Sequence, residues 1–280
     1  MVATPIGNLS DITLRAIQTL RAAHWIACED TRHTRPLLAH HGIEGRLLAV
    51  HQHNEAAAAE GILEKLAAGE SVALVTDAGT PAVSDPGARL VARIREAGYS
   101  VMPIPGPSAV VTALSAAGIA EGPFAFIGFL PAKSAARRRA IQKFASCPAA
   151  LVFYEAPHRV LETIADLAEE LGGARPLVIA KELTKLFETF HACRLDAAAE
   201  WFAADANRLR GEFVLIIGAP EQDDSSKDAD SERVLRLLLD DDLPVKQAAG
   251  LAAQIAGGNK KALYDLALQW KRNAENAQSD

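Results

Sequence analysis

The sequence predicts an α/β protein with two successive α/β domains, a linker and a small helical domain. Short apolar runs alternate with amphipathic segments over residues 1–119, and a second alternating set occupies residues 120–220. Residues 221–230 then contain five acidic residues and one lysine, a composition typical of linkers. Helical patterns follow over residues 231–274. Each of these four ranges is expected to be a separate part of the fold.

In the first domain, a strand–helix alternation predicts a parallel sheet covered on both faces. The expected strands are Trp25–Cys28, Leu47–Val50, Val72–Thr76 and Val101–Ile104. Asp11 is expected to cap a helix that runs to Ala23, and Asp85-Pro86 to cap a helix that Gly98 ends. Only three residues precede the first turn, so the first strand is expected either to be a stub or to begin upstream of Met1.

The second domain and the C-terminal part continue these patterns. The expected strands are Phe124–Phe129, Ala150–Tyr154, Leu177–Ala180 and Phe213–Ile217, with helices at about 134–145 and 158–171. Three further helices are expected at Ser231–Leu239, Pro244–Ala256 and Asn259–Arg272, with two glycines breaking the chain between the last two.

Composition excludes several classes of protein. The 280 residues are 49% hydrophobic and 23% charged, which is too apolar for a disordered chain. Three scattered cysteines fit a reducing compartment, and neither a signal peptide nor a membrane-length apolar run is present, so we expect a cytoplasmic protein that does not bind membranes. The net charge of −6 lacks the basic balance of a general nucleic-acid binder, so any RNA contact must use a local basic patch.

Several common site motifs are missing from the sequence. It contains no G-x-G spacing, no glycine followed by lysine, no G-x-S-x-G and no H-E-x-x-H, which argues against ordinary NAD, P-loop, serine-hydrolase and zincin sites. Histidines at positions 40, 41, 51 and 53 suggest a metal site, but no cysteine or carboxylate stands at a supporting spacing. We therefore predict no metal.

Three loops rich in glycine and proline follow expected strands of the first domain. They are Thr4–Asn8, Asp77–Gly87 and Pro103–Ala109. Ligands of open α/β sheets bind beyond the carboxyl ends of the strands, and glycine lets a ligand approach the backbone. These loops predict a preformed cleft for a small polar cofactor, whereas the alternative is a set of tight turns that cap the following helices, with Ser108 capping a helix through Ala117.

Eight short motifs in this order resemble the bacterial 16S rRNA cytidine 2′-O-methyltransferase I family of the tetrapyrrole methylase superfamily. The motifs are Thr4-Pro5-Ile6-Gly7-Asn8-Leu9, Glu29-Asp30-Thr31-Arg32-His33-Thr34, Asp77-Ala78-Gly79-Thr80-Pro81, Ser84-Asp85-Pro86-Gly87, Pro105-Gly106-Pro107-Ser108-Ala109, Gly128-Phe129-Leu130-Pro131, Tyr154-Glu155-Ala156-Pro157-His158-Arg159 and Glu182-Leu183-Thr184-Lys185. The resemblance covers about residues 1–218, and the C-terminal helices are similar to a small helical domain of some members.

This resemblance implies two α/β domains with S-adenosylmethionine (AdoMet) in the cleft between them, in a homodimer. It also implies 2′-O-methylation of a cytidine in the decoding region of 16S rRNA, which we expect within the assembled small ribosomal subunit. Relatives that methylate tetrapyrrole carbon have Gly-Asp-Pro where this chain has Gly79-Thr80-Pro81, and this difference favours RNA. Two alternatives stay open, namely a tetrapyrrole C-methyltransferase and a non-catalytic ribosome-binding factor.

The resemblance also implies site residues, by position. The expected cofactor contacts are Ile6, Asp77, Gly79, Thr80, Pro81, Val83, Ser84, Ser108, Ala109 and Tyr154. Asp30 or Glu182 is expected to accept or orient the proton of the ribose hydroxyl, with Arg32 and Lys181 handling charge and phosphate. The alternative for Asp30 is a helix cap, and for Lys181 and Glu182 a solvated pair.

A basic stretch is the expected RNA contact. Residues 122–154 contain five basic residues and no acid, and phosphate neutralisation supplies most nucleic-acid affinity. The expected RNA-binding residues are Lys133, Arg137, Arg138, Arg139, His158 and Arg159. The alternative is a solvated basic face of a helix.

Overall fold

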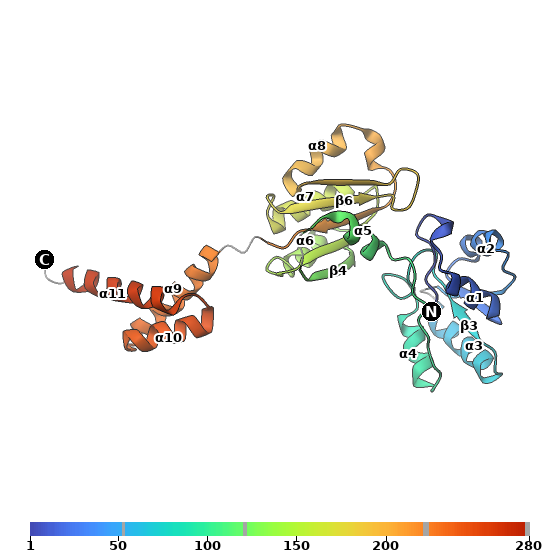
Figure 1. The fold of residues 1–280 in the computed structure, drawn as a ribbon, viewed down its shortest axis with the longest axis horizontal. Coiled ribbons are helices and arrows are strands. Elements are labelled where there is room, and N and C mark those ends of the chain that lie inside the picture. The colour runs from blue at the N-terminus through green and yellow to red at the C-terminus, as the bar shows by residue number, and fades with distance from the viewer. Residues whose placement is uncertain (52–53, 120–121, 221–223, 278–280) are drawn as a thin grey trace. The chain divides into compact units, whose positions relative to one another are not determined.

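The computed structural model describes residues 1–51, 54–119, 122–220 and 224–277 (Figure 1). The chain divides into two compact units, Met1–Pro220 and Glu221–Asp280. The first unit contains two β-sheets, and the described part of the second is helical. Within these ranges no helix is long and apolar enough to cross a membrane.

The first sheet has three parallel strands in the order β2 (Arg46–Ala49), β1 (Trp25–Cys28) and β3 (Val72–Leu74). The parallel sheet is as expected, but Val101–Ile104 is not a strand. Only a single bridge joins Val2 to Ile104, next to β3. Prolines at positions 103 and 105 have no N–H to donate, so a ladder cannot extend past this bridge.

Helices cover both faces of the first sheet. They are α1 (Leu14–Ala22), α2 (Thr31–His40), α3 (Glu55–Ala67) and α4 (Ala88–Glu96), and a short 3-10 turn, η1 (Leu9–Asp11), precedes them. Alternate strand residues enter two separate cores: Ile26 and Cys28 pack with α1 and α2, whereas Ala27 packs with α3 and α4. We call the first sheet with these helices, residues 1–108, the first lobe.

Two expected caps are wrong. Asp11 lies in the 3-10 turn, and α1 is capped instead by Thr13, whose hydroxyl accepts the N–H of Ala16 at 3.1 Å. The α4 helix begins after Gly87 without a side-chain cap from its own segment. The buried Glu55 carboxylate of α3 accepts the N–H groups of Gly87 and Leu90 at 3.0 and 3.1 Å. Glu55, which is distant in sequence, therefore provides the cap that was expected from Asp85.

The second sheet is mixed, with strand order β4-β5-β8-β6-β7. Its strands are β4 (Phe124–Phe129), β5 (Ala150–Glu155), β6 (Pro176–Lys181), β7 (Thr189–Arg194) and β8 (Phe213–Ile217). The β4–β5 pair is parallel and the other three pairs are antiparallel. The edge strand β7 was not expected, because its sequence, TFHACR, alternates polar and small residues without an apolar run.

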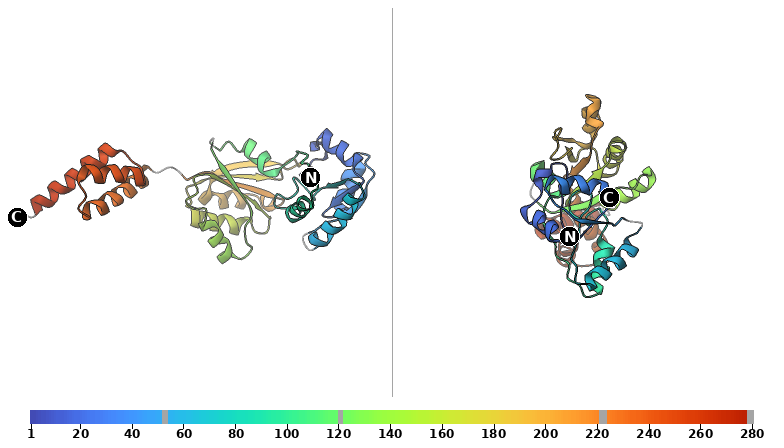
Figure 2. Two further views of the ribbon diagram at one scale, coloured as in Figure 1. Left: turned by 90° about the horizontal axis from the view of Figure 1, so that it is seen from below. Right: turned by 90° about the vertical axis from the view of Figure 1, so that its right-hand side faces the viewer.

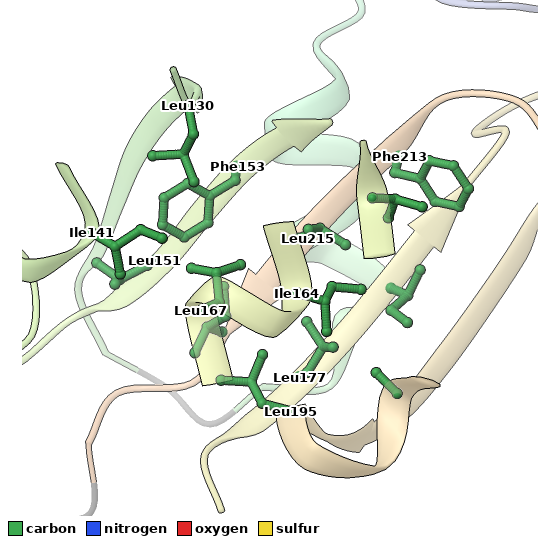
Figure 3. Packing of buried hydrophobic residues seen from close by; sticks show 14 of the residues in the cluster. Leu130, Ile141, Leu151, Phe153, Ile164, Leu167, Leu177, Leu195, Phe213 and Leu215 are labelled. Carbon is green, nitrogen blue, oxygen red and sulfur yellow. The ribbon is translucent and has the colours of Figure 1, made fainter. Parts of the chain in front are cut away.

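Both faces of this sheet are covered. Helices α6 (Ser134–Gln142), α7 (Val160–Leu171) and α8 (Ala198–Ala203) pack on the face that includes Leu151 and Phe153, whose core Figure 3 shows. On the other face, Val152 packs with α5 (Ala109–Ala117). Because α5 belongs to this core, the boundary between the two sheet regions comes before α5 and not at residue 119. We call residues 109–220 the second lobe.

The second unit consists of helices α9 (Asp224–Asp240), α10 (Val245–Ala256) and α11 (Lys260–Ala277), packed against one another (Figure 2). Small residues of α10 meet Leu235 of α9 and Leu263 of α11 in a common core. The expected linker at 221–230 is helical from Asp224 onward, since aspartate and serine favour the first turn of a helix as well as a linker. Residues 221–223 lie outside the described ranges.

Candidate functional site

A pocket of about 380 Å³ lies between the two lobes, where the loops after β3 and β5 meet. Its size and predominantly apolar wall are typical of sites for small ligands. The first lobe contributes Ile6, Ala78, Gly79, Thr80, Val83, Ser84, Asp85 and Ser108. The second lobe contributes Ala109, Phe129, Tyr154, Glu155, Ala156, Pro157, Leu183, Glu212, Phe213 and Val214.

Glycines allow the two lobes to approach closely beside the pocket. A Cβ atom on Gly7 would lie 2.6 Å from Cγ of Lys185, and the next residue, Asn8, donates its N–H to the Thr184 hydroxyl at 3.1 Å. On the other side, a Cβ on Gly128 of β4 would lie 2.7 Å from the Ser84 hydroxyl. Each contact fixes a pocket loop of the first lobe against the second lobe.

The three loops rich in glycine and proline are tied together as well. Thr4 and Gly79 exchange two backbone hydrogen bonds of 2.9 and 3.1 Å, and the Thr80 hydroxyl donates to the Pro107 carbonyl at 3.1 Å. Ser108 precedes α5 but makes no side-chain cap, so the capping alternative does not account for it. The loops therefore form one continuous wall of the pocket.

Backbone strain is concentrated in the loops at this pocket. Of the five non-glycine residues with positive φ in the described ranges, four lie in pocket loops: Ala82 and Ser84 in the first lobe, and Glu182 and Thr184 in the second. Their φ values are 70°, 63°, 52° and 63°. Such conformations cost on the order of 1–3 kcal/mol each and persist where the surroundings impose them, most often at functional sites.

Eight of the ten expected cofactor residues line the pocket, and Asp77 and Pro81 do not. Pro81 lies in the same loop after β3 but is buried. Asp77 accepts the N–H of Asp30 at 3.1 Å and contacts His33 Nδ1 at 3.0 Å, which places it at the first-lobe surface beside α2. Sequence reasoning missed most of the second-lobe wall. Phe129 is the last residue of β4, so the rule that ligands bind beyond the carboxyl ends of strands could have identified it. Phe213 is the first residue of the antiparallel strand β8, whose direction the sequence does not reveal.

Acidic groups surround the first-lobe side of the pocket. Burial, together with the charges of Glu29 and Asp77, raises the pKa of Asp85 to about 6. Burial and the charge of Asp77 also raise the pKa of Glu29. Across the pocket, burial raises the pKa of Tyr154 to about 12, so its phenol is neutral at physiological pH. This side of the pocket disfavours further negative charge and suits a cationic ligand.

The expected catalytic residue Asp30 serves as the cap of α2. Its carboxylate accepts the N–H of Arg32 at 2.8 Å and pairs with the Arg32 guanidinium at 2.6 Å. These hydrogen bonds from Arg32 lower the pKa of Asp30 to about 2. The Arg32 side chain is 85% exposed, and neither residue lines the pocket. The capping alternative is therefore the one observed for Asp30.

Lys181 is the last residue of β6 and Glu182 follows it, next to the pocket residue Leu183. Glu182 accepts the Lys185 ammonium and the N–H of Glu212, both at 3.0 Å. Burial opposes ionisation of Glu182, but these hydrogen bonds and the nearby lysines outweigh it and lower its pKa. Lys181 is buried rather than solvated. Neither side chain lines the pocket, so the structure does not bring Glu182 and Lys181 together with the expected cofactor residues.

Three of the expected RNA contacts, Arg137, Arg138 and Arg159, are bonded to other groups of the second lobe. Arg137 is 1% exposed and bonds Asp166 at 2.6 Å, while Arg138 pairs with two acids of α7. Arg159 donates to the carbonyls of Leu130 and Pro131. The acidic partners lie on α7, which follows the basic stretch in sequence. The composition of the stretch itself therefore does not show that its arginines are paired. Lys133, Arg139 and His158 are exposed.

No group of three or more His, Cys, Asp or Glu side chains that could hold a metal occurs within the described residues. His40 and His41 stack edge to face at the end of α2. His53 lies outside the described ranges.

Comparison with known proteins gives two family matches that follow the division of the chain. Residues 1–199 match the family of tetrapyrrole (corrin/porphyrin) methylases, and residues 225–271 match the RsmI C-terminal HTH domain. The ribosomal RNA small subunit methyltransferase I of Escherichia coli O157:H7 is 49% identical over 96% of this chain and 94% of its own length. The protein of that name from Pseudomonas aeruginosa is 48% identical over 96% of both chains.

Among solved structures, a uroporphyrin-III C-methyltransferase from Thermus thermophilus, in complex with S-adenosyl homocysteine, matches with a TM-score of 0.55. The alignment covers 78% of this chain and 95% of that one, at 21% identity. At this identity the match supports the fold: two α/β lobes of the tetrapyrrole methylase type.

Proposed function

The chain belongs to the tetrapyrrole (corrin/porphyrin) methylase family, among the ribosomal RNA small subunit methyltransferases I, and from this premise we propose that it methylates 16S rRNA. In the finer form of the proposal, AdoMet is the methyl donor and the acceptor is the ribose 2′-hydroxyl of a cytidine, cytidine 1402 in the usual rRNA numbering. The observation that carries the proposal is the pocket between the lobes, built by the motifs that relate the chain to this family.

The pocket suits AdoMet in size, polarity and charge. Gly79, with φ of 78°, leaves backbone accessible in the wall, and a side chain there would contact Ile6. Leu183 and Phe213 supply apolar surface from the other lobe, and Asp85 supplies negative charge. When bound, AdoMet supplies a sulfonium, which activates its methyl group and is also the leaving group. The protein then needs to hold the acceptor oxygen in line with the methyl and sulfur, and the rigid loops of both lobes fit this task.

Exposed basic side chains beside the pocket loops are proposed to contact RNA. His158 directly follows the pocket residue Pro157, and Lys133 and Arg139 lie at the start and on the exposed face of α6. We propose the C-terminal unit, which matches a helix-turn-helix domain, as a second RNA contact. Both contacts, like the expected homodimer, stay predictions.

Methyl transfer to several acceptors tests this proposal against its alternatives. Purified protein is incubated with radiolabelled AdoMet and with small ribosomal subunits from a strain that lacks the gene, deproteinised 16S rRNA or uroporphyrinogen. We expect label in the subunits. Label only in the tetrapyrrole would favour the C-methyltransferase. If calorimetry detects no AdoMet binding, the non-catalytic ribosome-binding factor becomes the favoured alternative.

A further inference from the structure

The proposed reaction needs a group that takes the proton of the attacking hydroxyl, and the two carboxylates expected from the sequence are committed elsewhere. Asp30 is held by Arg32 at the start of α2, and Glu182 is held by Lys185 and by the N–H of Glu212. Neither lines the pocket. A carboxylate that is already stabilised as an anion by a cation is also a weak base.

Three carboxylates do line the pocket: Asp85, Glu155 and Glu212. Glu155 is 2% exposed and accepts the Thr163 hydroxyl at 2.6 Å and the N–H of Ala156 at 2.8 Å, so it anchors its own loop. Glu212 pairs with the Lys185 ammonium at 2.8 Å, and its side chain is 78% exposed. Asp85 is the one carboxylate of the wall that has no hydrogen bond or ion pair within the described part of the chain.

Asp85 also has no structural task at the helix that follows it. The cap expected of it on α4 is provided by Glu55, which bonds Gly87 and Leu90. Its position is nevertheless well defined, because Ser84 is held at a φ of 63° and packs against Gly128 of the other lobe. The backbone thus holds Asp85 at the pocket wall, and its carboxylate is free to accept a proton.

We propose that Asp85 accepts the proton of the attacking hydroxyl during methyl transfer, an inference that rests on the function proposed above. In this step the oxygen–methyl bond forms and the methyl–sulfur bond breaks, and the sulfur keeps the electron pair and becomes a neutral thioether. The hydroxyl proton moves to the Asp85 carboxylate, which later releases it to water. The positive charge of the sulfonium and the negative charge of the carboxylate disappear together, so the step is balanced.

The surroundings of Asp85 match this role. A pKa of about 6 leaves the carboxylate ionised at neutral pH but more basic than an ordinary aspartate. Burial is the main cause of this raised pKa, and the charges of Glu29 after β1 and Asp77 after β3 add to it. On β5, the neutral Tyr154 phenol faces the same carboxylate, and His33 of α2 contacts Asp77.

The test compares Asp85→Asn with wild type in single-turnover methylation of small subunits. We expect the rate to fall by about 10²- to 10⁴-fold, the usual contribution of general base catalysis, whereas AdoMet affinity by calorimetry should fall by at most about tenfold, because the variant also removes a negative charge from the pocket wall. Asp11→Asn, the same exchange at an exposed site in the first lobe, is the matched control and should keep the wild-type rate. Because Asp85 makes no bond, the Asn variant should fold, which circular dichroism checks.

A pH profile adds a readout that a purely structural role would not move. For wild type, kcat/KM for AdoMet should rise with pH through about 6, because the base must be ionised in the free enzyme, and Asp85→Asn should lack this limb. Retained activity in Asp85→Asn would overturn the inference, as would a loss explained entirely by weaker AdoMet binding. If wild type itself does not label the subunits, the proposed function fails and the inference fails with it.

Discussion

Substitution of Arg137 distinguishes a structural arginine from an RNA contact. Its buried guanidinium bonds Asp166 at 2.6 Å and the Ala132 carbonyl at 3.2 Å. Arg137→Ala leaves the largely buried Asp166 with only the Ser134 hydroxyl as a partner. Removing one member of a buried ion pair costs about 3–5 kcal/mol. At about 2–4 °C per kcal/mol for a unit of roughly 200 residues, Tm should fall by about 6–20 °C.

Differential scanning calorimetry of the full chain measures this shift, and filter binding of small subunits is the second readout. Arg139→Ala, on the exposed side of the same helix, should change Tm by less than about 2 °C while it weakens binding to the subunits. The double variant Arg137→Met with Asp166→Leu should recover much of the lost stability, because it removes both charges. An Arg137→Ala protein that melts like wild type but binds the subunits poorly would show that Arg137 is an RNA contact and not a structural arginine.

Three other predictions follow from single contacts. Glu55→Ala should lower the free energy of unfolding by about 1–2 kcal/mol in urea titrations, because two N–H groups at the start of α4 lose their acceptor. Gly128→Ala should weaken AdoMet binding about tenfold in calorimetry, since its Cβ would displace the Ser84 loop, whereas Gly172→Ala, with a φ of 93° and open space around it, should not. The Asp30 carboxyl should titrate near pH 2 by NMR, and its pKa should rise toward the ordinary aspartate value of 3.8 in Arg32→Ala, which removes the side-chain hydrogen bonds but keeps the one from the backbone N–H. Because the folded-state pKa is lowered, the stabilisation is present above pH 3.8 and is lost as the pH falls toward 2.

Local patterns predicted the elements of this fold better than its pairings. Apolar runs located β1, β4 and β5 closely, since buried strands need them. They did not locate β7, which lies at a sheet edge, and they did not reveal that the second sheet is mostly antiparallel. Strand direction depends on the path of the connections, which no local pattern encodes.

The same limit applies to the site. Glycine and proline in three loops pointed to the pocket because backbone conformation is a local property. Charged residues were harder to assign, since a role depends on the partner that the fold provides. The ion-pair partner of Arg137 is Asp166 on α7. The cap expected from Asp85 is provided by Glu55, which is distant in sequence. Their roles emerge only when the fold brings these elements together.

Ribose methylation of 16S rRNA is tested most directly by identifying the labelled nucleotide. Small subunits from a strain that lacks the gene are methylated with radiolabelled AdoMet, and the rRNA is then digested to nucleosides and mapped by nuclease protection. We expect label in 2′-O-methylcytidine at one decoding-region site. Label on a base, label spread over many nucleotides, or no label despite measurable AdoMet binding would contradict it.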